Sequence, residues 1–126
     1  MDPIRAKNYM IKAENSLRMA KIALEQGAYD NAVMSSVHAA INSLDALTTL
    51  YLGKRSSGSH SDVVTMIRGI FTGKEHTDIS RQFTSLMSLK NASEYQPELM
   101  SRDAQMSVLH AERVVAKVKE RVDTKK

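Results

Sequence analysis

The sequence predicts an all-α fold, an antiparallel up-and-down bundle of four to five helices with a long N-terminal helical hairpin. Apolar residues recur at intervals of three and four along most of the chain, which is the period of an amphipathic helix. Only 2 prolines and 5 glycines interrupt the 126 residues, so long helices are permitted. No segment alternates as a strand does, and the length suits one domain, which we expect to span residues 1–126.

The predicted hairpin comes first in the chain. Asp2 and Pro3 predict the start of a helix. The Asp2 side chain can accept a hydrogen bond as the N-cap, and Pro3 suits the first helical position. Gly27 is the expected stop, and a second helix is expected from about Tyr29 to Leu52. Because the connection is so short, the two helices must pair antiparallel. Their apolar stripes are Ala6, Met10, Ala13, Leu17, Ala20 and Leu24, then Tyr29, Val33, Ser36/Val37, Ala40/Ile41, Leu44, Leu47 and Tyr51.

The rest of the chain predicts three more helices. Residues 54–59 form a loop by composition, and two shorter helices are expected on either side of Gly73. After a break at residues 95–97, Ser101 is expected to cap a last long helix with Asp103 in its first turn, and residues 123–126 are expected to fray. The three apolar stripes are Val63, Ile67 and Ile70/Phe71; Ile79, Phe83 and Leu86/Met87; and Ala104, Val108, Ala111, Val115, Val118 and Val122.

Composition excludes several classes of protein. The chain has no cysteine, which removes disulfides, thiolate metal sites and cysteine nucleophiles and suits a reducing compartment. No apolar run approaches the roughly 18 residues of a membrane span, and no secretory signal opens the sequence, so we expect no membrane association and a cytoplasmic location. The net charge of +4 favours attraction to polyanions without indicating a dedicated nucleic-acid binder, and a solvated basic surface explains it equally well.

Familiar catalytic motifs are missing. The sequence has no glycine-rich phosphate loop, nucleophile elbow, His-Glu-x-x-His motif or acidic calcium loop. The four histidines lie in four segments, and no two have metal-ligand spacing. We therefore expect no metal and no cofactor.

Two histidines and a lysine are candidates for a binding site. His38 lies beside the second helical stripe, where a half-buried packing role is the simpler interpretation, and His60 opens the third predicted helix, where it could cap backbone or line a cleft. Lys90 shares the helical phase of Ile79, Phe83 and Leu86, so it occupies a core position, where burial of an unpaired ammonium is costly. Either its stem reaches out to solvent at a helix end, or the cation lines a cleft and binds phosphate, with Glu94 and Tyr95 close by in sequence.

A basic ridge is predicted on the last helix. His110, Arg113, Lys117 and Arg121 are three or four residues apart, beside the apolar stripe. Such a ridge could follow a phosphate backbone. The interspersed Glu112 and Glu120 make an ordinary solvated face the alternative.

Four stretches together resemble the HEPN superfamily (higher eukaryotes and prokaryotes nucleotide-binding domains), especially its small stand-alone prokaryotic members. The likeness covers nearly the whole chain. Residues 13–32 are similar to the first helix and turn of the family, and residues 36–47 to its alanine-rich second helix. Residues 60–74 resemble the third helix, and Leu89-Lys90-Asn91-Ala92-Ser93-Glu94-Tyr95 resembles the Arg-x-x-Ala-Asp-Tyr pattern before the last helix.

The resemblance implies an antiparallel bundle that often dimerises, with a polar cleft at or near the dimer interface. Many members of the superfamily are RNA-cleaving toxins paired with a nucleotidyltransferase-type antitoxin. Their motif is arginine, four to six residues, then histidine, and it acts without metal: the histidine handles protons and the arginine holds the phosphate.

This chain departs from that motif. Lys90 stands where the family has arginine, Glu94 stands for aspartate, and no histidine follows at the required spacing. The paired tyrosines of the second helix are replaced by Val37 and His38. Arg55 and His60 have the right spacing, but they flank the loop after the second helix, which is the wrong place in the family order.

Three hypotheses follow from these observations. The first is a HEPN-like homodimer that binds nucleotide or RNA, or pairs with a nucleotidyltransferase-type partner, without strong catalysis. Its site would contain Lys90, Asn91, Glu94, Tyr95, His60 and His38. The second is a metal-independent endoribonuclease toxin, and the third is a helical adaptor whose methionine-bearing faces bind another protein, since the chain has 8 methionines.

Overall fold

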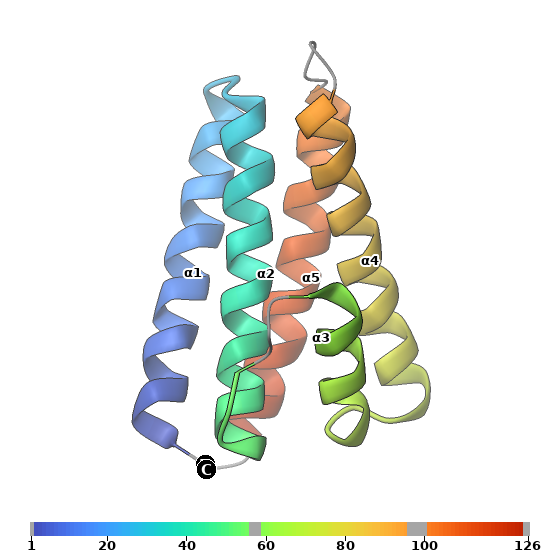
Figure 1. Ribbon diagram of the computed structural model, residues 1–126. Helices are drawn as coiled ribbons and strands as arrows, with labels where there is room; N and C mark the ends of the chain where they lie inside the picture. The colour runs from blue at the N-terminus through green and yellow to red at the C-terminus, as the bar shows by residue number, and fades with distance from the viewer. Residues whose placement is uncertain (1, 56–58, 96–100, 125–126) are drawn as a thin grey trace.

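The computed structural model describes residues 2–55, 59–95 and 101–124, with only the backbone of residues 93–95. Its helices are α1 (Pro3–Glu25), α2 (Tyr29–Leu52), α3 (His60–Met66), α4 (Gly73–Tyr95) and α5 (Ser101–Thr124), and a 3-10 turn, η1 (Ile67–Gly69), follows α3. These ranges contain no strand. The predicted all-α bundle is confirmed: four long helices run roughly parallel or antiparallel to one another, and the short α3 lies beside the lower half of α4 (Figure 1).

The N-terminal hairpin forms where the sequence predicts it. Asp2 accepts a 3.1 Å hydrogen bond from the backbone N–H of Arg5, which caps α1. Gly27 lies in the left-handed region at φ 75°, and the N–H of Ala28 returns to the carbonyl of Ala23 at 2.9 Å. A residue with a Cβ is strained at that φ, so glycine suits the turn between α1 and α2.

Helix α4 is longer than predicted. The sequence pattern indicated a short helix, but α4 has 23 residues and equals α1 in length. Its buried apolar residues, Ile79, Phe83 and Leu86, cover only its middle, so the pattern reports the packed part of the helix rather than the whole. The expected break at residues 95–97 falls mostly on residues 96–100, outside the described part of the chain.

Helix α2 is the centre of the bundle. It packs against α1, α4 and α5, and it is buried almost continuously from Ala39 to Thr49. Its buried hydroxyls are satisfied within the helix: Ser36 donates to the carbonyl of Ala32 at 2.7 Å and Ser43 to that of Ala40 at 2.8 Å. The largest buried side chains around it are Phe71, Phe83, Leu44, Leu47, Ile67 and Leu86.

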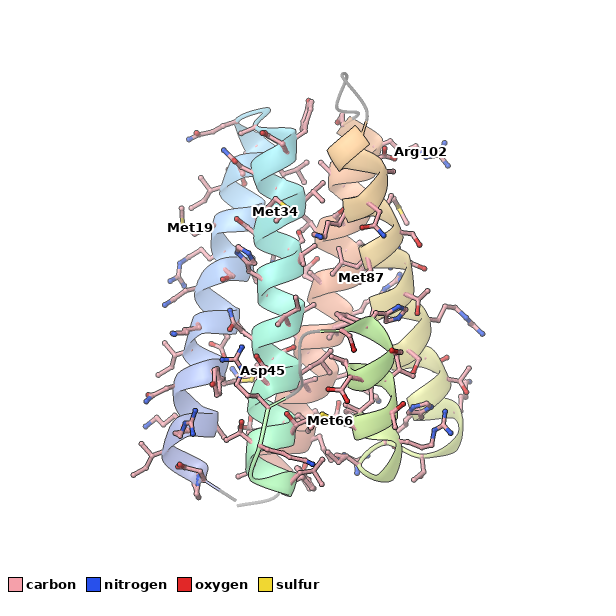
Figure 2. The ribbon with its side chains drawn as sticks, viewed as in Figure 1. Met19, Met34, Asp45, Met66, Met87 and Arg102 are labelled. Carbon is pink, nitrogen blue, oxygen red and sulfur yellow. The ribbon has the colours of Figure 1, made fainter. Side chains whose placement is uncertain are left out.

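Small residues bring α1 close to α2. Ala6, Ala13 and Ala20 are spaced by seven residues on α1 and are almost fully buried. The opposite face of α1 carries exposed apolar side chains, and Figure 2 shows one of them, Met19, pointing away from the bundle. None of the helices, over the residues described, is long and apolar enough to cross a membrane.

Candidate functional site

The candidate site at the end of α4 is only partly described. Lys90 is half-buried and Asn91 is exposed, both near the C-terminal end of the helix. Glu94 and Tyr95 belong to the helical backbone, but their side chains lie outside the described part of the structure. Their predicted proximity to Lys90 therefore stays a prediction.

His60 contacts α4 at Thr84 and Phe83, six and seven residues before Lys90 along the helix. Its Nε2 lies 2.8 Å from the hydroxyl of Thr84, and its ring meets the Phe83 ring edge-on, with centroids 5.3 Å apart. Thr84 precedes Lys90 by six residues, which corresponds to roughly 9 Å along the helix and about 120° around it. The helix start is capped by Ser59, whose hydroxyl accepts the N–H of Asp62 at 3.1 Å, and not by His60.

The other histidines do not join this group. His38 is exposed on α2, so the half-buried packing interpretation of this residue is wrong. His76 on α4 has its Nε2 3.1 Å from the carbonyl oxygen of Val64, which ties α4 to α3. His110 on α5 has its Nδ1 2.6 Å from Oε1 of Gln82. The histidines of α3, α4 and α5 thus each use a ring nitrogen to join two segments.

Arg55 and His60, which have the numerical spacing of the family motif, contact different helices. Arg55 pairs with Asp45 on α2 at 3.7 Å, whereas His60 contacts α4. This geometry agrees with treating the spacing as coincidental.

Three of the four residues of the basic ridge contact side chains of α4. Arg121 and Lys117 both pair with Glu75, at 2.8 Å and 3.4 Å, and His110 contacts Gln82. Only Arg113 among the four ridge residues is exposed. The ridge therefore contributes mainly to the packing of α4 against α5.

Electrostatic shifts follow from these contacts. Burial lowers the pKa of His110, and the nearby Arg113 charge lowers it further. Burial alone would raise the pKa of Glu75, but the hydrogen bonds and charges of Arg121 and Lys117 outweigh it, so the Glu75 pKa is lowered. In the ranges that the structure describes, no three His, Asp or Glu side chains lie together in a group that could hold a metal ion.

The sequence reasoning missed a polar cluster on the α1–α2 hairpin. Asp45 is buried in α2, and Arg55 connects it to Tyr9 on α1, with the Arg55 Cζ 5.9 Å from the ring centroid. Arg5 donates to the Tyr9 hydroxyl at 3.4 Å. A carboxylate within the apolar run Leu44-Asp45-Ala46-Leu47 was the available signal, because a buried acid requires a partner.

A groove separates α1 from α5. Its larger section has a volume of about 660 Å³ and is lined mainly by aliphatic side chains, among them Met10, Ile11 and Val122. Glu14 and Lys119 form a 3.3 Å ion pair across it. A second section of about 540 Å³ continues along the same two helices.

Comparison with known proteins agrees with the resemblance seen in the sequence. The model of the HEPN domain matches residues 6–121. The fold is similar to that of TT1696 from Thermus thermophilus, with a TM-score of 0.74 and 19% identity over 93% of this chain and 98% of that one. It is also similar to ST0689, an archaeal HEPN homologue, with a TM-score of 0.70 and 20% identity over 97% of this chain and 99% of that one. No curated protein matches the chain in sequence. Because the family model covers most of its length, the chain belongs to the HEPN domain family.

Proposed function

We propose that this HEPN domain binds nucleotide or RNA without cleaving it and pairs with a nucleotidyltransferase-type protein. The observation that carries the proposal is the use of the histidines. His60, His76 and His110 each direct a ring nitrogen to a neighbouring segment, at Thr84, Val64 and Gln82. A general base must reach the proton it removes, beside the group that holds the phosphate. None of these contacts lies at Lys90, since Thr84 and Gln82 precede it by six and eight residues on α4 and Val64 lies on α3.

Lys90 and Asn91 provide the proposed contact with phosphate. In the sequence they match the stretch that resembles the family motif, and they lie near the C-terminal end of α4. An ammonium attracts phosphate as a point charge but lacks the two-pronged geometry of a guanidinium. A lysine in place of arginine therefore favours binding of phosphate with little stabilisation of a transition state.

A homodimer is also part of the proposal. The outer face of α1 exposes Ile4, Ile11, Met19 and Ile22. From Ile4 to Ile22 the stripe is roughly 27 Å long. A second copy of the chain, laid antiparallel along it, would place Ile4 of each copy against Ile22 of the other and remove both stripes from water.

Cleavage and binding assays test the proposal together. Purified protein is incubated with labelled single-stranded RNA in EDTA, and binding of RNA and of ATP is measured by anisotropy or calorimetry at 50 and 200 mM salt. We expect binding that weakens with salt, and no cleavage. Lys90→Ala should weaken binding several-fold, whereas Lys74→Ala, an exposed lysine in the first turn of the same helix, should not. Cleavage that Lys90→Ala abolishes would contradict the proposal and establish the ribonuclease alternative.

Co-expression tests the protein partner. The chain is expressed with a small nucleotidyltransferase encoded beside it, and the two are purified through a tag on one of them. We expect a complex that survives size exclusion. Elution of the two proteins in separate peaks would remove this part of the proposal and leave ligand binding to be judged on its own assay.

A further inference from the structure

Two arginine side chains, those of Arg5 and Arg55, contact the side chain of Tyr9 at the surface of the hairpin. Arg5 and Tyr9 are one turn apart on α1, and Nη2 of Arg5 donates to the Tyr9 hydroxyl at 3.4 Å. Arg55, from the segment after α2, places its Cζ 5.9 Å from the centroid of the same ring. The guanidinium groups come from positions 50 residues apart in sequence, so only the fold brings them together.

The buried Asp45 forms an ion pair with Arg55. The Asp45 side chain is 4% exposed, and its Oδ2 is 3.7 Å from Nε of Arg55, whose own side chain is 59% exposed. Burial makes an unpaired carboxylate costly, so the acid favours a cation at this place. In Figure 2, Asp45 lies on α2 partway along the hairpin. Nε of Arg55 faces Asp45, and more than half of the Arg55 side chain is exposed to solvent.

The cluster has an excess of positive charge. The Asp45 carboxylate is 3.7 Å from Arg55, and the Asp2 carboxylate accepts from the backbone N–H of Arg5 rather than from its guanidinium. Two like charges on one ring repel each other, and an anion between them would relieve the repulsion. Guanidinium groups donate to phosphate oxygens in pairs, and a phenol adds a further donor, so phosphate is the anion whose geometry fits.

We propose that Arg5, Tyr9 and Arg55 form a phosphate-binding site on the α1–α2 hairpin, with Asp45 as a positioning residue that holds Arg55 over Tyr9. The phosphate belongs to a free nucleotide or to the backbone of RNA. The inference rests on the proposed function for its ligand class, but its site is separate. The start of α1 lies at the opposite end of the bundle from the C-terminal end of α4, and Lys90 lies five residues before that end (Figure 1).

Charge-neutral variants of the full-length protein test the site. ATP and a labelled RNA oligonucleotide are titrated in separate arms. Arg5→Gln and Arg55→Gln should each weaken binding about tenfold, the loss expected for a charge-assisted hydrogen bond. Arg18→Gln is the matched control, since Arg18 lies on another face of α1 with its guanidinium on Asn15, and it should change the affinity less than twofold. Binding of ATP alone identifies a nucleotide site, and binding of RNA alone, or of both, identifies a backbone contact.

Asp45→Asn tests the positioning role. This change should weaken binding several-fold in the wild-type background and have no further effect in Arg55→Gln, because it acts through Arg55. A purely structural role would instead lower the affinity equally in both backgrounds. Circular dichroism checks that each variant is folded, and if Asp45→Asn unfolds, Asp45→Glu replaces it, with the same non-additivity expected.

Several outcomes would overturn the inference. The first is an equal loss of affinity in Arg18→Gln and Arg5→Gln, because that result would indicate an effect of net charge alone. The second is the absence of binding to both ATP and RNA. The third is an equal loss of affinity from Asp45→Asn in the wild-type and Arg55→Gln backgrounds. Lys90→Ala separates the two proposals. If it removes binding and the arginine variants do not, the Lys90 site stands and this one fails; the reverse result establishes this site and removes Lys90 from the proposed function.

Discussion

Arg121 on α5 and Glu75 in the first turn of α4 form an ion pair in which Nη2 lies 2.8 Å from Oε1. The same guanidinium donates from Nη1 to the carbonyl of Ile70 at 3.2 Å, and its Cζ lies 5.0 Å from the centroid of the Phe71 ring. One side chain therefore joins the last turns of α5 to the turn between η1 and α4. Arg121, a member of the predicted basic ridge, thus stabilises this end of the bundle.

We expect Arg121→Met to lower the free energy of unfolding by about 1–3 kcal/mol, because the Ile70 carbonyl and Glu75 lose a charged donor while the apolar stem is kept. Thermal unfolding followed by circular dichroism measures the change. Arg113→Met, at an exposed position two turns earlier on α5, is the control and should stay within about 0.5 kcal/mol. Equal losses in both variants would show that the contacts of Arg121 are unimportant.

His110 should make stability depend on pH. Its pKa is lowered in the folded state by burial and by Arg113, so the unfolded chain binds a proton more readily. The stability that neutral His110 contributes is fully present above pH 6.5, the ordinary histidine pKa. It is lost as the pH falls through the lowered pKa that His110 has in the folded protein. Urea unfolding between pH 8 and pH 5 should therefore show a fall in stability that is smaller in His110→Gln. The same fall in both proteins would contradict this assignment.

Phe83 should be among the most sensitive core positions. It is 2% exposed and also supports the ring of His60. Phe83→Ala should cost about 3–5 kcal/mol through lost burial and the cavity left behind, and Phe83→Leu should cost less. Urea unfolding measures both, with the midpoint lowered and the slope unchanged. A loss below about 1 kcal/mol for the alanine variant would mean that this part of α4 is not packed as described.

The exposed stripe on α1 allows the proposed dimer to be tested. Ile11→Glu should convert the proposed dimer to a monomer, because it places a charge in the apolar interface. Sedimentation velocity over a range of concentrations measures the oligomeric state. Ser88→Glu adds the same charge at an exposed position on α4 and should leave the dimer intact. A wild-type chain that sediments as a monomer throughout would remove the dimer from the proposed function.

Local signals predicted α1, α2 and α5 closely. Asp2 and Pro3 mark the start of α1, Gly27 and Gly53 follow the ends of the hairpin helices, and the apolar spacing matches their buried faces. Each signal is short-range, since a cap or a helical period depends on residues within about four positions. The family resemblance was also present in the sequence, because it rests on short stretches in a constant order.

The use of the polar residues could not be predicted in this way. Arg121 meets Glu75 across 46 positions and His110 meets Gln82 across 28. The length of α4 beyond its apolar middle was missed for a related reason, because its last turns carry little of the buried pattern.

The sequence by itself therefore determined an all-α HEPN bundle and its N-terminal hairpin, and it predicted a lysine, Lys90, at the place of the motif arginine. Only the tertiary structure decided that the histidines of α3, α4 and α5 bind neighbouring segments, and that Arg5 and Arg55 share Tyr9. The physical reason is the sequence separation between the residues that interact. Helices follow from neighbours in sequence, whereas the partner of a charged or hydrogen-bonding side chain depends on how the helices pack.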